Sequence, residues 1–271
     1  FGEKISGKCI KTFIAIPTTS GTGSEVTNTA VISDTEHHQK APIMEDYLTP
    51  DVALLDPRLV MTAPNSVTAY SGLDVLTHGL EALVALDANT ITDALAEKSI
   101  DIIINCLVEC YQHGDNEEAR KVVHEASCSA GIAFNNAGLG ICHAIAHQLG
   151  ATFHIPHGLA NAMLLPYIVE YNASHCELAM KKYAIAVRKS GLASSGMGDR
   201  VAVRKLQSQI KNMMRQMNCP TSLAAFGIDT KEALEATEHI VAAAKLDGTF
   251  PGNPIVPTDE DLSEIYHKII K

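Results

Sequence analysis

The sequence from Gly140 to Asn161 constrains the fold more than any other stretch, because it holds four of the twelve histidines around one helix break. His143 and His147 are four residues apart in a helix-favouring segment, so both side chains leave one helix face about a turn apart. Pro156 ends that segment, and His157 opens a second run that again favours a helix. Two helices joined at such a corner can aim His143 and His157 at one point, a common way to build a metal site.

A carboxylate with matching geometry lies earlier in the chain. Asp74 and His78 stand at i and i+4 in another helix-favouring segment. Together with His143 and His157 they make one carboxylate and three neutral imidazoles, a donor set that suits Fe(II) or Zn(II) and leaves one or two positions for a substrate oxygen. Spacing alone leaves an alternative open, since a histidine on a helix is more often a core or surface residue. Glu81 is a further candidate, either as an acceptor that orients a ligand or as a solvated helix residue.

Four motifs stand in order along the chain: Pro-Thr-Thr-Ser-Gly-Thr-Gly-Ser-Glu from Pro17, Asp74-x-x-x-His78 followed by Gly-Leu-Glu, His143-x-x-x-His147-x-Leu-Gly, and Pro156-His157-Gly-x-Ala-Asn-Ala. In their residues, order and separation these motifs resemble the iron-containing (group III) alcohol dehydrogenases. The resemblance covers residues from about 13 to 165 and is nearest to the alcohol dehydrogenase part of bifunctional aldehyde–alcohol dehydrogenases and to the propanol and ethanol dehydrogenases.

The resemblance implies roles for individual residues. It supports Asp74, His78, His143 and His157 as metal ligands, and it implies that His147 touches the substrate and relays a proton. The alternative for His147 is a neutral histidine packed beside the ligands. Six residues are implied to contact the cofactor: Thr18, Thr19, Thr22, Val31, Lys40 and Leu59. Without the resemblance, the Thr/Ser/Gly run is predicted to be an ordinary surface loop, although its hydroxyl and N–H groups suit an anion or a ribose.

The implied activity is metal-dependent oxidation of short-chain primary alcohols, or reduction of the aldehydes, by hydride transfer with NAD or NADP. One alternative is a metal-dependent hydrolase or lyase that uses the same Asp/His site. Another is a truncated, inactive metal-binding fragment, because the chain begins with Phe1 and shows no Gly-rich turn of the kind that holds a cofactor's pyrophosphate. The strand-then-Thr-rich-loop pattern favours the dehydrogenase.

Periodicity predicts strands followed by helices. Strands are expected over 12–17, 30–32 and 51–57, with a polar turn at 37–40. Nine helices are expected, over 65–86, 90–113, 117–135, 138–150, 159–171, 178–189, 200–217, 231–244 and 260–270. The predicted fold is therefore an α/β remnant of a nucleotide-binding domain (1–60) followed by an all-α metal and substrate domain (61–271), a dehydroquinate synthase-like architecture, with the site in the cleft between them.

Charge and cysteine usage limit the partners. A formal net charge of −10 argues against nucleic acid and against an anionic membrane. No apolar run is long enough to span a bilayer, and no signal peptide is visible. Seven cysteines without CxxC spacing are typical of a reducing cytoplasm. We therefore expect a cytoplasmic protein whose partners are a small alcohol or aldehyde and either copies of itself or the rest of a larger fusion.

Overall fold

Short strands precede the helices in the computed structural model, which describes residues 12–34 and 39–271. β1 (Ile14–Ala15) pairs in parallel with β4 (Val52–Ala53), with Ile14 opposite Val52. The prediction of a buried strand over 12–17 is wrong in its extent and burial, since Ile14 is 53% exposed. The strand predicted over 51–57 is also shorter, because Pro57 begins a 3-10 helix, η3 (Pro57–Leu59).

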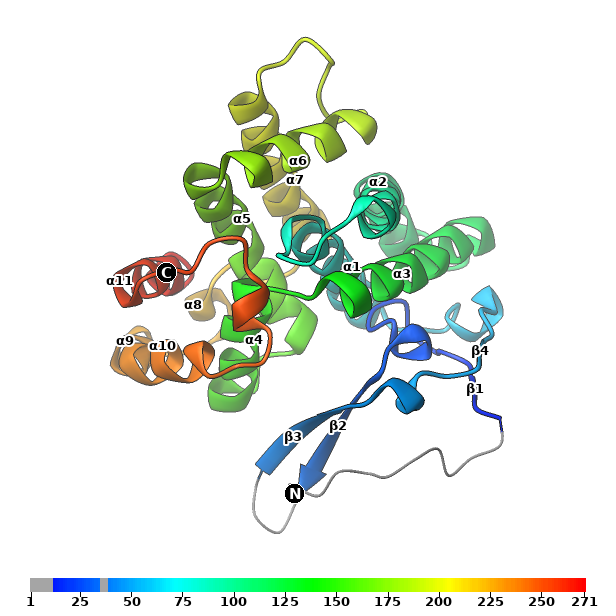
Figure 1. Cartoon of the computed structure of the whole chain (residues 1–271), viewed down its shortest axis with the longest axis horizontal. Helices are drawn as coiled ribbons and strands as arrows, with labels where there is room; N and C mark the ends of the chain where they lie inside the picture. Colours follow the sequence, from blue (N-terminus) through cyan, green and yellow to red (C-terminus); the bar gives the residue numbers. More distant parts are fainter. Residues whose placement is uncertain (1–11, 35–38) are drawn as a thin grey trace.

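A β-hairpin forms the part of the molecule farthest from the helices, as Figure 1 shows. β2 (Thr29–Asp34) and β3 (Gln39–Met44) are antiparallel, with Thr29 opposite Met44. β2 is longer than the strand predicted over 30–32. The polar turn predicted over 37–40 is wrong from Gln39 onward, where β3 begins. Pro42 and the polar residues before it disfavour a strand by propensity, but an edge strand tolerates them. His37 and His38 lie outside the described residues.

Helices make up the chain from Asn65 onward, and their order follows the predicted one. Their bounds are α1 (Asn65–Val84), α2 (Thr90–Gln112), α3 (Glu117–Ala137), α4 (Ile141–Phe153), α5 (His157–His175), α6 (Glu177–Lys189), α7 (Asp199–Gln216), α8 (Leu223–Phe226), α9 (Thr230–Glu235), α10 (Thr237–Lys245) and α11 (Asp259–His267). Three further 3-10 turns are η1 (Ser24–Val26), η2 (Asp46–Leu48) and η4 (Phe250–Gly252). The single helix predicted over 231–244 is wrong, because α9 ends at Glu235 and α10 begins at Thr237, whose hydroxyl donates to the Leu234 carbonyl.

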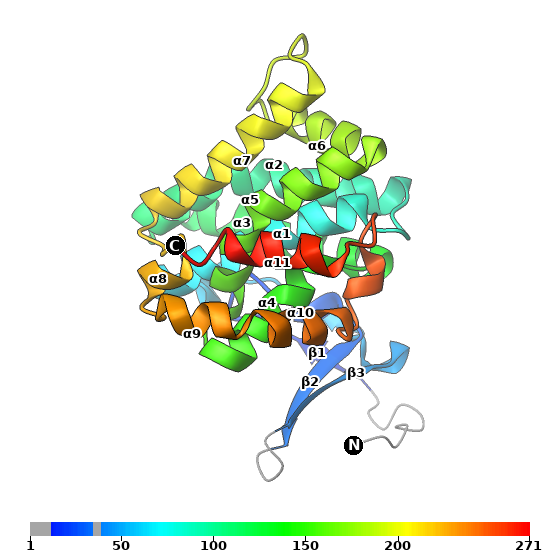
Figure 2. The ribbon, with the colours of Figure 1, turned by 90° about the vertical axis from the view of Figure 1, so that its left-hand side faces the viewer.

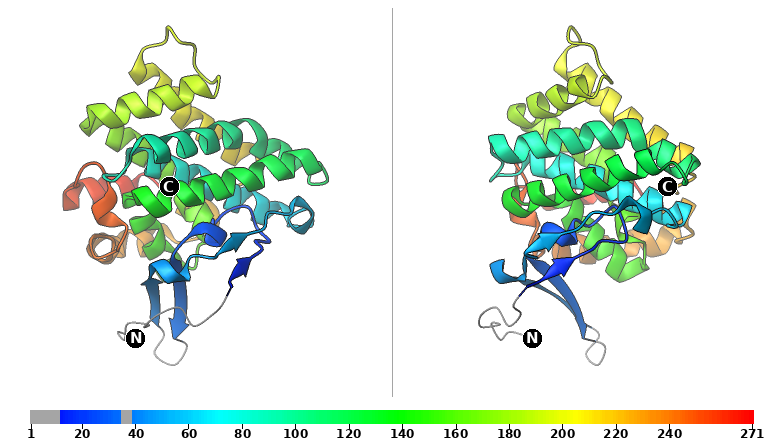
Figure 3. Two further views of the ribbon diagram at one scale, coloured as in Figure 1. Left: turned by 45° about the vertical axis from the view of Figure 1, so that its right-hand side comes forward. Right: turned by 90° about the vertical axis from the view of Figure 1, so that its right-hand side faces the viewer.

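α1 is the central helix and is buried almost all round after its first turn. Its glycines let α2 approach closely: a Cβ on Gly79 would lie 2.8 Å from Ser99 Oγ, and one on Gly72 only 2.1 Å from a Leu107 methyl carbon. α2 and α3 pack against each other and against α1, and Figure 3 shows this pair above the strand segment. α5 covers another side of α1, and Figure 2 shows α11 running across the outside of the bundle.

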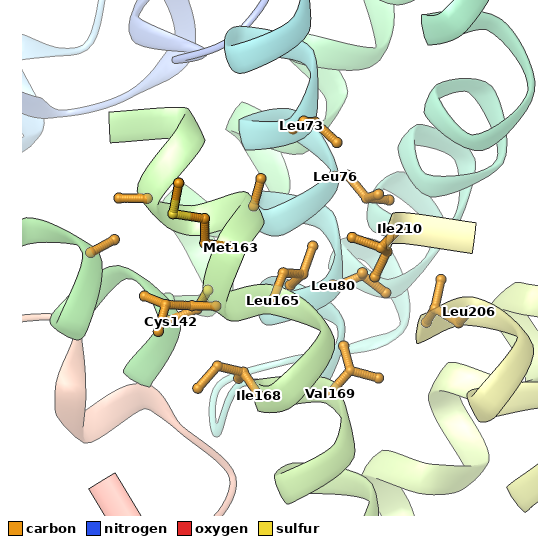
Figure 4. Close-up of a cluster of buried hydrophobic side chains, with 14 of the residues drawn as sticks. Leu73, Leu76, Leu80, Cys142, Met163, Leu165, Ile168, Val169, Leu206 and Ile210 are labelled. Carbon is orange, nitrogen blue, oxygen red and sulfur yellow. The ribbon is translucent and has the colours of Figure 1, made fainter. Parts of the chain in front are cut away.

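The core lies where α1, α5 and α7 meet. Figure 4 shows Leu73, Leu76 and Leu80 of α1 beside residues of α5, with Leu206 and Ile210 of α7 closing the cluster. All these leucines and Ile210 are fully buried, and each such side chain contributes about 1.5–3 kcal/mol relative to exposure. Packing of these leucines therefore fixes α1 in place, and α1 is the helix that carries Asp74 and His78.

Candidate metal centre

Four side chains from three helices meet at one point. One ligand atom from each of Asp74, His78, His143 and His157 lies within 4.8 Å of all the others. The three Nε2 atoms surround the Asp74 carboxylate: His78 Nε2 is 3.8 Å from Oδ2, and His143 Nε2 and His157 Nε2 are 3.7 and 3.5 Å from Oδ1. The structure therefore brings together all four side chains that the sequence singled out as ligands.

The cluster is buried on three sides and open on the fourth. Asp74, His78 and His143 are buried, whereas the His157 side chain is 42% exposed. Burial lowers the pKa of His78 and His143, which keeps both imidazoles neutral and able to bind a metal. Burial alone would raise the pKa of Asp74, but the surrounding imidazoles and the Asn161 amide outweigh it and lower that pKa overall.

The donor set fits a divalent ion. Ligand atoms about 2.1 Å from one tetrahedral ion are about 3.4 Å apart, and the separations from Asp74 are 3.5–3.8 Å. These distances exceed hydrogen-bond length, so the imidazoles and the carboxylate face one another without bonding directly. The His78 ring also stacks on the His143 ring, with centroids 4.8 Å apart and an interplanar angle of 13°, which holds the two Nε2 atoms side by side.

Asn161 adds a buried amide that the sequence analysis did not assign. It lies one turn after His157 on α5, and its Nδ2 donates to Asp74 Oδ1 at 2.8 Å. The same nitrogen is 3.1 Å from His143 Nε2 and 3.2 Å from His157 Nε2, while Asn161 Oδ1 is buried and has no hydrogen-bond partner among the described residues. Its spacing of four from His157 was the signal that could have identified it.

Glu81 is buried beside His143, so the alternative prediction that Glu81 is a solvated helix residue is wrong. The carboxylate is 2% exposed, with Oε2 2.5 Å from His143 Nδ1 and Oε1 accepting a bond from the Cys142 N–H at 2.7 Å. Burial raises the pKa of Glu81 to about 7 despite these hydrogen bonds.

His147 faces the open side of the cluster. Its side chain is 41% exposed, its ring stacks on the His157 ring at 5.2 Å, and its Nδ1 is 2.8 Å from Asp247 Oδ2. Asp247 lies a hundred residues away in sequence, in the turn after α10, and no local pattern identifies it. His154 is exposed and ends α4 in the left-handed conformation, with a φ of 54°.

The Thr/Ser/Gly run forms a loop beside this centre. Gly21 packs on α1, where a Cβ would lie 2.7 Å from Ser71 Cβ, one turn before the Asp74 carboxylate. Thr18 and Thr22 are exposed, and Thr19 lines a small cavity shared with Arg120 of α3. The Thr22 hydroxyl accepts a bond from the Ser24 N–H at 3.3 Å. Two of the three threonines are therefore accessible to a ligand.

One stripe of α3 holds this loop. His124, Cys128, Gly131 and Asn135 lie at i, i+4, i+7 and i+11 on one face of the helix. Ser20 Oγ is 2.9 Å from His124 Nδ1, and the Asn28 N–H donates to Asn135 Oδ1 at 3.0 Å. Cys128 interacts with the buried Glu25, and a Cβ on Gly131 would lie 2.9 Å from Gly23 Cα. His124 of α3 thus contacts the loop through Ser20.

Of the remaining predicted cofactor contacts, the structure describes the side chain of Leu59 but not those of Val31 and Lys40. Leu59 is exposed at the end of η3, 45% of it accessible. Val31 and Lys40 occupy strands β2 and β3, but their side chains lie outside the described residues.

An N-terminal segment of short strands, followed by an all-helical domain that gathers an Asp/His cluster, defines the fold class of this chain. The chain belongs to the iron-containing alcohol dehydrogenase family. The profile described as "Fe-containing alcohol dehydrogenase family, C-terminal" matches residues 68–270, and that described as "Iron-containing alcohol dehydrogenase" matches residues 2–57.

Two relatives illustrate the range of the family. A 1-propanol dehydrogenase of Citrobacter freundii is 42% identical over 261 residues, which are 96% of this chain and 70% of that enzyme. An aldehyde-alcohol dehydrogenase of Streptococcus pneumoniae is 40% identical over 276 residues, covering 98% of this chain and 31% of that protein. This chain thus spans little more than two thirds of the first relative and under a third of the second.

Solved structures agree with the fold. An alcohol dehydrogenase from Oenococcus oeni has a TM-score of 0.90 at 33% identity, covering 98% of this chain and 68% of that one. A sulfoacetaldehyde reductase from Bifidobacterium kashiwanohense, solved in complex with NAD+, has a TM-score of 0.86 at 29% identity, covering 99% of this chain and 67% of that one. These comparisons confirm the predicted family and fold class, and they do not favour a hydrolase or lyase.

None of the helices in the described part of the chain combines the length and the apolar composition that a membrane-crossing helix needs.

Proposed function

We propose that the protein is a metal-dependent alcohol dehydrogenase that interconverts short-chain primary alcohols and aldehydes with a nicotinamide cofactor. The observation that carries this proposal is the convergence of Asp74, His78, His143 and His157 within 4.8 Å, next to a hydroxyl-rich loop. The names of the relatives, among them a propanol dehydrogenase and a butanol dehydrogenase, support the reaction class and small alcohols as substrates.

The four clustered residues are the proposed ligands of Fe(II), the ion for which the family is named; Zn(II) also suits the donor set. When bound, a divalent ion supplies Lewis acidity that polarises the substrate oxygen. Asp74 contributes the single negative charge of the donor set, and the neutral imidazoles add none. The open side near His157 and His147 is the side from which a small substrate reaches the centre.

His147 is the proposed proton-transfer residue. Asp247 accepts a hydrogen bond from His147 Nδ1–H, which fixes the tautomer and leaves Nε2 free. In alcohol oxidation, Nε2 takes the proton that the substrate hydroxyl releases, and the exposed ring passes it to solvent. In aldehyde reduction the same nitrogen returns a proton to the oxygen.

The loop from Thr18 to Glu25 is the proposed contact for the nicotinamide side of the cofactor, together with Val31, Lys40 and Leu59. A nicotinamide supplies the hydride acceptor that no protein side chain provides. The structural relative solved with NAD+ supports NAD, and NADP is the alternative that a cofactor comparison distinguishes. A cytoplasmic location and self-association or fusion stay predictions, the latter supported by the longer aldehyde-alcohol dehydrogenase.

The test combines elemental analysis with an absorbance assay. The protein, purified without added metal, is analysed for iron and zinc and then assayed for NAD or NADP reduction with ethanol and 1-propanol. Asp74→Ala and His157→Ala are expected to lose bound metal and at least about 100-fold in activity, since each removes part of the Lewis-acid site.

A matched control is His239→Ala, which removes an exposed histidine of α10. This variant should keep the parent's metal content and activity. Full activity with normal metal loading in either ligand variant would contradict the assignment of the centre.

A further inference from the structure

Glu81 is a buried carboxylate that the proposed reaction does not use. It follows Asp74 by seven residues and His78 by three on α1, so all three side chains leave the same helix face. No Lys or Arg ion pair with Glu81 occurs among residues 12–34 and 39–271. A buried carboxylate is costly unless its oxygens are bonded, and both oxygens of Glu81 are.

The two oxygens serve different elements. Oε1 accepts a bond from the Cys142 N–H in the first turn of α4, where helix N–H groups lack partners within the helix. Oε2 lies 2.5 Å from Nδ1 of His143, the next residue. Glu81 therefore both ties α1 to the start of α4 and contacts the far nitrogen of a proposed ligand.

We propose that Glu81 is a positioning residue that holds His143 in the Nδ1–H tautomer, so that the Nε2 lone pair faces Asp74 and the metal. The assignment rests on the proposed metal centre. The 2.5 Å contact between Oε2 and Nδ1 requires a proton between the two atoms. A neutral imidazole carries one proton, and a carboxylate that is ionised only accepts hydrogen bonds, so with Glu81 ionised the proton belongs on Nδ1. A carboxylate bonded to the outer nitrogen also makes the ligating nitrogen more basic and fixes the ring orientation.

Asn161 supports the same tautomer independently. Its Nδ2 must point at Asp74 Oδ1, 2.8 Å away, because the reverse orientation would place two acceptor oxygens together. In this orientation the amide nitrogen is also 3.1 Å from His143 Nε2. An amide nitrogen can only donate, and its second hydrogen has His143 Nε2 at 3.1 Å or His157 Nε2 at 3.2 Å as the acceptor. A bond to the nearer of the two requires a lone pair rather than a proton on His143 Nε2.

Glu81→Gln separates the positioning role from the structural one. The amide oxygen of the glutamine can still accept the Cys142 N–H, whose direction is fixed by the backbone. The amide NH2 then faces His143 Nδ1 and requires an acceptor there, so the imidazole proton moves to Nε2. The α1–α4 link is kept, while the ligand nitrogen is blocked by its own proton.

The experiment measures both the tautomer and the metal affinity. Nitrogen-15 chemical shifts of the histidine rings in the metal-free protein should show His143 as Nδ1–H in the parent and as Nε2–H in Glu81→Gln. Zinc affinity, measured by competition with a chelator, should fall about 10–100-fold in Glu81→Gln. Asp247→Asn is the matched control: it makes the same change beside His147, and should alter the His147 signals while leaving zinc affinity and His143 unchanged.

Two results would overturn the proposal. One is a His143 that carries its proton on Nε2 in the parent, a measurement that needs no variant to fold. The other is a folded Glu81→Gln variant that binds zinc as tightly as the parent. Failure of the proposed metal centre gives a different result, because the parent and Asp74→Ala would then bind zinc equally weakly. The tautomer of His143 in the parent would still test the role of Glu81 in that case.

Discussion

His147 combines an outer nitrogen that faces the Asp247 carboxylate with a partly exposed ring, whereas His143, whose outer nitrogen faces Glu81, is buried. These properties suit proton transfer better than ligation. We expect His147→Ala to keep its metal and to lose about 100-fold or more in kcat, the usual contribution of a general acid or base. Steady-state kinetics with 1-propanol and metal analysis of the same preparation check this expectation.

His113→Ala is a suitable control for that experiment, since His113 is exposed at the end of α2. A His147→Ala enzyme with the parent's kcat would leave the ring without a proton-transfer role. Loss of metal in the variant would instead make His147 part of the ligand set.

Residues differ sharply in how well the sequence predicts their roles. The clustering of the proposed ligands could be predicted because His143 and His157 flank one helix break, and Asp74 and His78 share one helix face. Asp247 could not, because its contact with His147 spans a hundred residues and depends on where the turn after α10 lies. The sequence gives His124 no feature that distinguishes it from other helical histidines. Its role is visible only in the structure, where α3 packs against the loop that contains Ser20.

At the scale of the elements, the approach of α5 to α1 decides whether the ligands meet. Gly158 follows His157 directly, and a Cβ there would lie 2.0 Å from the Tyr70 carbonyl oxygen and 3.2 Å from Asp74 Cβ. The Tyr70 carbonyl belongs to the backbone of α1 and cannot move aside as a flexible side chain can. Gly158→Ala is therefore expected to push α5 away from α1. We expect a loss of about 1–3 kcal/mol in the free energy of unfolding and at least a tenfold loss in zinc affinity.

Chemical denaturation and chelator competition measure these two quantities. Gly196→Ala provides the matched control, since no atom of the described residues lies within 4 Å of a Cβ at that position. The stability of this variant should change by less than about 0.5 kcal/mol. Equal stability and zinc affinity in Gly158→Ala and the parent would show that the close approach is unimportant.

The face of α3 that holds the loop gives a second prediction at this scale. A Cβ on Gly131 would lie 2.8 Å from a Val26 methyl carbon and 2.9 Å from Gly23 Cα, so Gly131→Ala pushes the loop away from α3. If the loop contacts the cofactor, KM for the nicotinamide should rise about tenfold, equivalent to about 1.4 kcal/mol, with the metal content unchanged.

Ser129→Ala is the control for Gly131→Ala, because the Ser129 hydroxyl donates to the Glu125 carbonyl within α3. An unchanged KM in Gly131→Ala would separate the loop from cofactor binding, whereas loss of metal would show that the substitution disturbs more than the loop.

At the scale of the whole molecule, local patterns describe the helical part better than the strands. Helix starts and ends depend on nearby residues, and the predicted helices from Asn65 to Lys189 lie within a few residues of the observed ones. Strand pairing depends on distant partners. Ile14 of β1 pairs with Val52 of β4, 38 residues later in the chain. β3 forms because it pairs with β2, and the sequence around Gln39 and Lys40 does not show this partner, so these residues were predicted to form a turn.

Strands β1 and β4 also expose one apolar face, with Ile14, Ile16, Val52 and Leu54 each between 44% and 53% accessible. Parallel sheets normally bury both faces. By contrast, the helices form a continuous core around α1. The part of the molecule that carries the proposed ligands is therefore the better packed of the two.

Metal binding should be visible in the stability of this helical part. The proposed ligands come from α1, α4 and α5, so an ion that binds only when the three helices are together stabilises the folded state. With free zinc at about 100 times its Kd, the gain is about 2.7 kcal/mol, which corresponds to a rise in Tm of about 5–10 °C for a chain of this size. Thermal unfolding of chelator-treated and zinc-loaded protein measures the rise, which Asp74→Ala should not show. Identical Tm values for the parent with and without zinc would be incompatible with a metal site that joins these helices.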